Sequence, residues 1–267
     1  MPILGGIVMA KLFTDIVLEV GRMCNLQCDH CLRGECENLT MPFEIAKKAI
    51  DLVTDIKTIT FSGGEPTLYG KEIAKIIDYI IASKKSVGAF YIASNGTLYS
   101  PELMRALVEL YTYCEEKEIC YFDISTDKYH KQSYAELYHK PLMFHPAYDA
   151  FSFVTRRGEL KEDYVILEGR AKDNCYSDRT PKYNAKFDLA TWSADGKENW
   201  CNECEMMYVT AKGQISPNCD LSYDTFDELD LPNIKNINST DELIEAMNIY
   251  DVKVAFNEHF KKIAYAV

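Results

Sequence analysis

The sequence predicts an α/β fold with a parallel sheet in its first half, followed by a small cysteine-rich α+β extension. Short β-type apolar runs alternate with helical patterns up to about residue 140, and this rhythm stops after Pro141. Repeated β-α units imply parallel strands joined by right-handed crossovers. Thiols are grouped in two separate parts of the chain, the second of them beyond the alternating region.

The elements of the first half follow one another in a regular order. Apolar side chains in helical phase mark the helices, such as Ile45, Ala49 and Val53, and glycine-containing turns end the strands. Ser100 followed by Pro101 is a helix start signal. The predicted strands are residues 15–20, 57–61, 87–93 and 119–125, and the predicted helices are residues 43–53, 71–83, 101–114 and 128–139.

The second half predicts fewer regular elements. Residues 151–155 and 164–167 are typical of strands, and residues 208–211 and 214–216 predict a hairpin around Lys212-Gly213. Ser239 and Glu242 form a capping box that opens a short helix. A last helix is expected around Phe256, Phe260 and Ile263.

Composition and charge narrow the function classes. The chain has 267 residues, 47% hydrophobic and 26% charged, enough for one medium domain and a small appendage. A net charge of -12 argues against a nucleic-acid backbone or an anionic membrane as the main partner. No stretch reaches the roughly 20 apolar residues that span a bilayer, and residues 1–10 lack a basic start. We expect a cytoplasmic protein.

The ten cysteines point to metal rather than to disulfides, because the cytosol keeps thiols reduced. They are unevenly spaced. The first group is Cys24, Cys28, Cys31 and Cys36, and the second is Cys175, Cys201, Cys204 and Cys219. Cys114 and Cys120 stand apart, and we interpret them and Cys36 as incidental thiols.

Cys24, Cys28 and Cys31 have CxxxCxxC spacing. Three thiolates on one loop can hold three irons of a 4Fe–4S cluster, which leaves the fourth iron open for a ligand. A zinc site or simple buried thiols are the alternatives at this point.

Polar signals follow all four predicted strands. The cysteine loop comes after the first strand, Gly63-Gly64-Glu65-Pro66 after the second, Ser94-Asn95-Gly96 after the third and Ser125-Thr126-Asp127 at the end of the fourth. Sites in parallel α/β folds lie at the carboxyl ends of strands. We therefore expect these four segments to line one cavity.

The cysteine triplet, followed one strand later by Gly63-Gly64-Glu65-Pro66, resembles the radical S-adenosylmethionine (SAM) superfamily, over residues 13–140. The resemblance implies a partial (β/α)6 barrel whose cluster, held by Cys24, Cys28 and Cys31, is chelated by SAM. It also implies that the GGEP run contacts the SAM amino group. The other SAM contacts that it implies are His30 against the adenine, Ser94 and Asn95 near the methionine and ribose, and Ser125 and Asp127 near the ribose.

The resemblance also implies a reaction. The reduced cluster passes one electron to SAM, which breaks into methionine and a 5′-deoxyadenosyl radical, and this radical abstracts hydrogen from the substrate. An electron donor such as flavodoxin or ferredoxin is expected, with a small molecule or a peptide as substrate. The alternative from another class is a zinc-stapled, non-catalytic binding protein.

The second cysteine group resembles the twitch or SPASM extensions of radical SAM enzymes. Cys201, Cys204 and Cys219, with the hairpin between them, are expected to hold an auxiliary 4Fe–4S cluster. Cys175 would either close the cluster as a fourth ligand or leave one iron open for substrate. The expected domains are an extension at residues 1–12, the radical SAM core at 13–170 and the auxiliary domain at 171–267.

Overall fold

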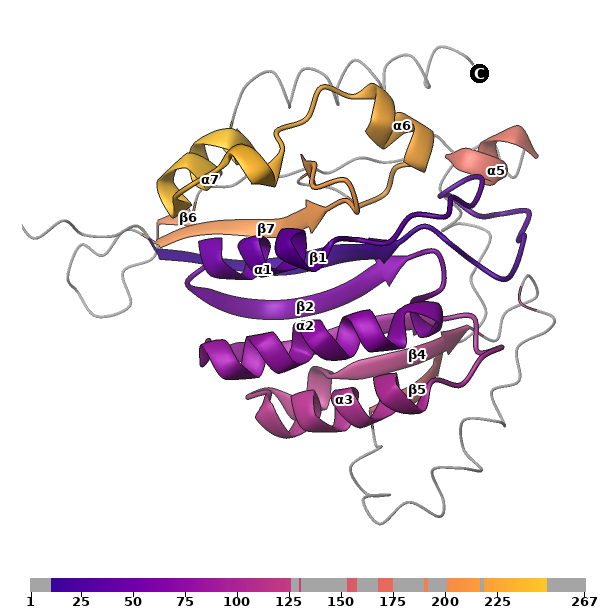
Figure 1. Cartoon of the computed structure of the whole chain (residues 1–267), viewed down its shortest axis with the longest axis horizontal. Helices are drawn as coiled ribbons and strands as arrows, with labels where there is room; N and C mark the ends of the chain where they lie inside the picture. Colours follow the sequence, from indigo (N-terminus) through magenta and orange to yellow (C-terminus); the bar gives the residue numbers. More distant parts are fainter. Residues whose placement is uncertain are drawn as a thin grey trace, which may run out of the picture.

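The computed structural model describes residues 11–125, 130, 153–157, 168–174, 190–191, 201–216 and 219–248. The eight strands of this part of the chain form one sheet, in which seven follow the order β5-β4-β3-β2-β1-β7-β6 (Figure 1) and β8 pairs with β7. The strands are β1 (Lys11–Gly21), β2 (Asp55–Gly63), β3 (Val87–Ser94), β4 (Tyr121–Ser125), β5 (Val154–Arg157), β6 (Ala190–Thr191), β7 (Cys201–Val209) and β8 (Ile215–Ser216).

Strands β1 to β5 are parallel and neighbour one another in chain order. Right-handed crossovers between strands added in one direction place every connecting helix on the same face of the sheet. Helices α1 (Phe43–Leu52), α2 (Gly70–Ser83) and α3 (Pro101–Tyr113) accordingly cover one face (Figure 1). The predicted parallel α/β fold is confirmed, as an open sheet rather than a closed barrel.

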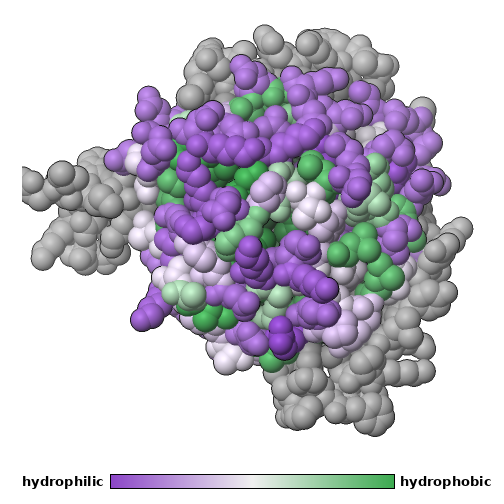
Figure 2. All heavy atoms as spheres, in the orientation of Figure 1, coloured by the Kyte–Doolittle hydropathy of each residue, from purple (hydrophilic) through white to green (hydrophobic). Residues whose placement is uncertain are grey.

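The three helices form where their apolar periodicity predicts them. Ser100 caps α3 by accepting a hydrogen bond from the Leu103 N–H, with Pro101 in the first turn. Helix α2 ends at Ser83 and is capped by Lys84, which takes a left-handed conformation with φ 57°. One stripe of each helix is buried against the sheet, whereas polar residues dominate the outer face (Figure 2).

The second half of the chain adds to the same sheet. Strand β7 pairs in parallel with β1, and β8 returns beside it as the predicted hairpin, with Gly213 at φ 91° in the turn. Helix α5 (Gly169–Asp173) precedes β6, whereas α6 (Tyr223–Glu228) and α7 (Thr240–Asn248) follow β8, with Ser239 capping α7 as predicted. The predicted auxiliary domain therefore shares a sheet with the core, and its boundary at residue 171 remains a prediction.

The start of β4 differs from the sequence prediction, and some predicted elements lie outside the described residues. Lys117–Ile119 forms a short 3₁₀ helix, so β4 begins at Tyr121 rather than at Ile119. The predicted helix at 128–139, the strand at 164–167 and the last helix lie outside the described residues. None of the helices in the described part of the chain is long and apolar enough to cross a membrane.

Candidate functional site

A cavity of about 380 Å³ lies at the carboxyl-terminal edge of the sheet, where β1 to β4 end. Parallel strands bring their carboxyl ends to one edge, so the loops that follow them meet there. The predicted convergence of four segments is borne out, because each contributes to the wall. The contributions include Cys24, Cys28 and Cys31 after β1, Gly63, Gly64, Glu65 and Pro66 after β2, Ser94 and Asn95 after β3, and Ser125 at the end of β4.

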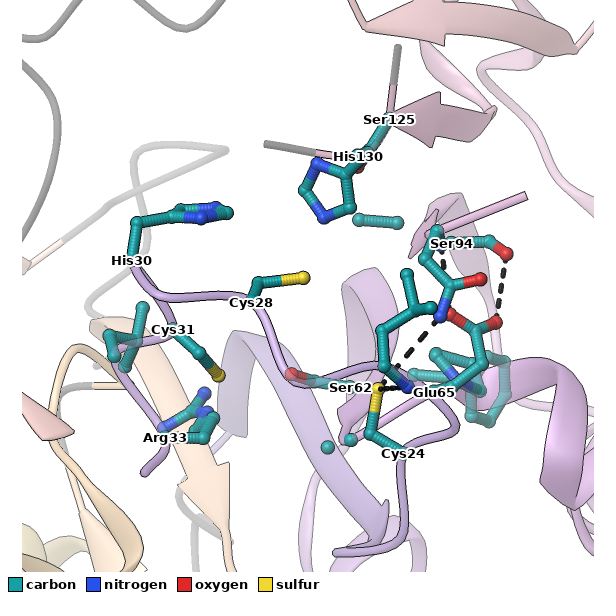
Figure 3. Close-up of a pocket in the computed structure, with 18 of the residues that line it drawn as sticks. Cys24, Cys28, His30, Cys31, Arg33, Ser62, Glu65, Ser94, Ser125 and His130 are labelled. Atoms are coloured by element: carbon teal, nitrogen blue, oxygen red, sulfur yellow. Dashed lines mark hydrogen bonds between the residues drawn. The ribbon is translucent and has the colours of Figure 1, made fainter. Parts of the chain in front are cut away.

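The cysteine loop begins three residues after β1. The Cys31 N–H donates to the Cys28 carbonyl at 3.1 Å, and the Gly34 N–H donates to the Cys31 carbonyl at 3.4 Å. These consecutive turns help to bring the three thiols to the same cavity, each of them partly exposed. Figure 3 shows the sulfurs of Cys24, Cys28 and Cys31 around a shared space.

The donor set fits a 4Fe–4S cluster. Among the described residues, no three His, Cys, Asp or Glu side chains converge closely enough to hold a single metal ion. In a 4Fe–4S cluster each thiolate binds a different iron, so its three sulfurs are spaced around the cluster rather than gathered at one point. Thiols that line one cavity from different sides suit that arrangement.

The Cys24 thiol is held by two donors. Burial raises its pKa to about 11, the Leu26 N–H opposes this, and the charge of Glu65 adds to the rise. The sulfur accepts hydrogen bonds from the Leu26 N–H at 3.5 Å and from the Asn95 side-chain amide at 3.8 Å. These donors favour the thiolate once a metal takes the place of the proton.

Gly63 and Gly64 pack against the backbone at the start of the cysteine loop, where no larger residue fits. A Cβ at Gly63 would lie 2.1 Å from the Gly21 carbonyl oxygen, and one at Gly64 would lie 2.1 Å from that of Met23. The Gly64 and Glu65 N–H groups donate to these same two carbonyls, both at 2.9 Å. The paired glycines thus let the end of β2 dock closely against the start of the loop.

Tyr69 is part of this support, although sequence reasoning missed it. Its hydroxyl accepts from the Met23 N–H at 2.8 Å and donates to the Leu39 carbonyl at 3.3 Å. The ring packs so closely on Gly21 that a Cβ there would lie 2.2 Å from it. The position of Tyr69, three residues after the GGEP run, was the one available signal.

The Glu65 carboxylate is buried and accepts four hydrogen bonds from the chain. The Thr67 N–H and hydroxyl lie at 3.0 and 2.7 Å, the Ser94 hydroxyl at 2.8 Å and the Asn95 N–H at 2.8 Å. Glu65 therefore joins the ends of β2 and β3. Its predicted contact with the SAM ammonium remains a prediction.

Asn95 links the third strand to the cysteine loop. Its side-chain amide donates to Asn25 at 3.0 Å as well as to Cys24, and Asn25 donates to Thr97 at 2.7 Å. Ser125 is buried and lines the cavity, as predicted, whereas Asp127 lies outside the described residues.

Two histidines lie in contact with each other in the lining of the cavity. The rings of His30 and His130 lie 5.3 Å apart in an edge-to-face arrangement, and both residues line the cavity. His30 is placed where an adenine contact was predicted, and that role remains a prediction. No sequence motif marks His130.

Two arginines line the cavity as well, and sequence reasoning missed both. Arg170, on α5, donates through Nε to the Cys28 carbonyl at 3.0 Å. Arg33 donates to the Leu221 carbonyl at 2.8 Å. Figure 3 shows Arg33 with Cys31 on one side of the cavity, and Glu65 with Ser94 on the other.

The second cysteine group is only partly described. Cys201 and Cys204 lie in β7, whose backbone pairs them with Lys11 and Thr14 near the start of β1. Cys219 follows β8 and packs against the cluster of Val17, Tyr208, Leu221, Phe226 and Leu231. Burial raises the pKa of its thiol to about 12. Cys175 lies outside the described residues.

Curated relatives match a limited part of the chain. An uncharacterized protein of Methanocaldococcus jannaschii is 34% identical over 99 residues, covering 36% of this chain and 35% of that protein. The tungsten-containing aldehyde ferredoxin oxidoreductase cofactor-modifying protein of Pyrococcus furiosus is 33% identical over 101 residues, with 36% and 27% covered. The AdoMet-dependent heme synthase of Nitratidesulfovibrio vulgaris is 38% identical over 93 residues, with 33% and 24% covered. The matched segments thus span between a quarter and about a third of these relatives.

The fold resembles that of a solved SAM-binding structure. Native anSMEcpe with bound AdoMet and Cp18Cys peptide aligns with a TM-score of 0.51 over 91% of this chain and 83% of that chain, at 15% identity. Residues 18–149, which contain the cysteine loop and the GGEP run, match the family described as the Radical SAM superfamily. The predicted family is therefore confirmed, and the chain belongs to the radical SAM superfamily.

Proposed function

We propose that this chain holds a 4Fe–4S cluster on Cys24, Cys28 and Cys31 and cleaves SAM reductively at that cluster. The observation that carries the proposal is one cavity lined by the three thiols and by the ends of β2, β3 and β4. A zinc module has no need for these strand ends to be gathered beside its ligands.

When bound, the cluster supplies the electron that splits SAM into methionine and a 5′-deoxyadenosyl radical, which takes hydrogen from a substrate. The chain's own residues do the rest. The three thiolates bind iron, and the closely docked Gly21–Gly64 and Met23–Glu65 backbone pairs keep the loop in place. Ser94, Asn95 and Ser125 offer polar groups in the cavity to orient SAM.

The proposal extends to SAM cleavage and leaves the substrate open. The names of the relatives refer to heme synthesis and to modification of a tungsten enzyme's cofactor. Their matched segments are too short to transfer any of these activities. A flavodoxin or ferredoxin is the proposed electron donor, and a cytoplasmic location is the proposed setting.

Anaerobic reconstitution with iron and sulfide tests the proposed function. We expect a brown protein that releases 5′-deoxyadenosine when dithionite and SAM are both present, and none when either is omitted. A colourless protein that retains zinc, with no 5′-deoxyadenosine, would reject the proposal in favour of a zinc-stapled binding protein.

The auxiliary cluster is a separate proposal, supported by the cysteine spacing around the β7–β8 hairpin. Two clusters would give about eight irons per chain, and one cluster about four. Joint replacement of Cys201, Cys204 and Cys219 by Ala should then reduce the iron by half. Unchanged iron in that variant would exclude the auxiliary cluster. A loss of auxiliary-cluster signal in Cys175→Ala would identify the fourth ligand.

A further inference from the structure

Arg33 and Tyr223, close to the cysteine loop, have N–H or O–H groups that make no hydrogen bond to the described residues. Arg33 carries five N–H groups, and the one that makes a hydrogen bond in the described part of the chain reaches the Leu221 carbonyl. The Tyr223 hydroxyl is buried and makes no hydrogen bond to any described residue. Buried donors without a hydrogen-bond partner are rare in folded proteins, because leaving one unsatisfied costs about 1–3 kcal/mol.

The C-terminal segment holds the Arg33 side chain in place. Its guanidinium lies over the rings of Tyr208, Phe226 and Tyr223, at 5.1, 5.9 and 6.0 Å from their centroids. The Tyr223 N–H also donates to the Arg33 carbonyl at 3.1 Å. Because aromatic rings approach the face of a guanidinium, its N–H groups remain available at the edge.

No carboxylate of the described residues forms an ion pair with Arg33. Burial works against the charge of Arg33, but nearby groups that include Glu19 raise its pKa, so the guanidinium stays charged and can bind a further anion. Arg33 lies two residues after Cys31 and lines the same cavity (Figure 3). Tyr223 lies beside Arg33, since its N–H donates to the Arg33 carbonyl at 3.1 Å and its ring centroid lies 6.0 Å from the Arg33 guanidinium. An anionic group at Cys31 would lie beside Arg33, and Tyr223 is the buried donor packed against that arginine.

We propose that Arg33 and Tyr223 are positioning residues that stabilise the reduced form of the cluster from the Cys31 side. This inference rests on the proposed function, which puts the cluster on Cys24, Cys28 and Cys31. Three thiolates give such a cluster a net negative charge, and reduction adds one more. A nearby cation and a hydroxyl donor favour the more negative state, so together they raise the reduction potential.

A redox titration of the anaerobically reconstituted chain, followed by electron paramagnetic resonance without SAM, tests the inference. Tyr223→Phe removes only the hydroxyl, and Arg33→Gln removes the charge. At a fixed potential we expect the ratio of reduced to oxidised cluster to fall about threefold in Tyr223→Phe and about tenfold in Arg33→Gln. Arg33→Lys should recover part of the loss, because it restores the charge.

Matched controls are Tyr113→Phe, whose hydroxyl bonds to the Lys85 carbonyl far from the loop, and Arg105→Gln on the exposed face of α3. Both should keep the wild-type potential. An unchanged potential in Tyr223→Phe at full iron content would overturn the inference, and so would an unchanged potential in Arg33→Gln that retains its iron. Failure of the proposed function is a different result, in which the wild-type chain binds no cluster or releases no 5′-deoxyadenosine.

Discussion

The guanidinium of Arg22 lies 2.8 Å from the carboxylate of Asp227 on α6, 205 residues later in the chain. Arg22 is fully buried just before the cysteine loop and also bonds to Glu19 and Glu37, both at 2.7 Å. Arg33, just after the triplet, contacts the same C-terminal segment. Residues that follow β7 therefore contact the chain on both sides of the cysteine triplet, Asp227 at Arg22 and Leu221 at Arg33.

Asp227→Asn should make the fold less stable at neutral pH. Burial alone would raise the pKa of Asp227, but hydrogen bonds from Arg22 and Lys212 lower it below the usual value. A carboxyl with a lowered folded-state pKa stabilises the fold above its unfolded pKa of about 3.9 and loses this contribution as pH falls through the folded pKa. We expect a loss of about 1–2 kcal/mol at pH 7, since Arg22 keeps two other partners.

Urea unfolding of the metal-free protein across the acid range measures this effect. The difference between wild type and Asp227→Asn should shrink as the pH drops below about 4. Asp51→Asn, which breaks an exposed pair with Lys47, is the control and should have a smaller effect. A difference that stays constant with pH would show that the Asp227 charge is not the cause.

Cys28→Ala, or the same change at Cys24 or Cys31, should abolish 5′-deoxyadenosine formation and greatly lower the iron content. Losing one of three thiolates leaves an iron of the cluster without its protein ligand. Cys36→Ala is the matched control on the same loop, since the Cys36 thiol donates a hydrogen bond to the Cys24 carbonyl at 3.7 Å. If Cys28→Ala cleaves SAM at the wild-type rate, the triplet does not hold the cluster.

Glu65→Ala should weaken SAM binding roughly ten- to hundredfold if the carboxylate pairs with the SAM ammonium. The structure adds a second effect, because four donors lose their acceptor at once and the fold should become less stable by about 2–4 kcal/mol. Calorimetry with SAM and unfolding of the metal-free protein separate the two. Unchanged SAM affinity would remove Glu65 from the SAM site, and unchanged stability would contradict its role in joining β2 to β3.

Gly64→Ala should displace the cysteine loop and impair iron retention. The added methyl group would lie 2.1 Å from the Met23 carbonyl oxygen, inside any normal contact distance. Gly34→Ala is a useful comparison, because Gly34 has φ +82° but its nearest neighbour lies 3.6 Å away. Iron retention after reconstitution should fall far more in Gly64→Ala, and an equal fall in both variants would contradict the steric explanation.

The sequence predicted the helices and strands of the first half well because the signals there are local. Apolar periodicity marked α1 to α3, and the Ser100 cap depends on residues adjacent in the chain, as does the Gly213 turn in the second half. The partners of Arg22, Arg33 and Tyr69 could not be predicted in this way. Each contacts residues from distant elements, and single arginines and tyrosines carry no pattern that marks such contacts.

The sequence by itself determined the family, the parallel direction of β1 to β4 and the loops that would meet at one cavity. The reason is that cysteine spacing, glycine pairs and strand-ending turns are local signals, each contained within a few consecutive residues. Only the tertiary structure decided that Gly63 and Gly64 accommodate the chain's own carbonyls and that Glu65 joins two strands. It also decided that β7 lies against β1 and that α6 reaches the cysteine loop, because pairing across some 200 residues depends on packing and leaves no local signal.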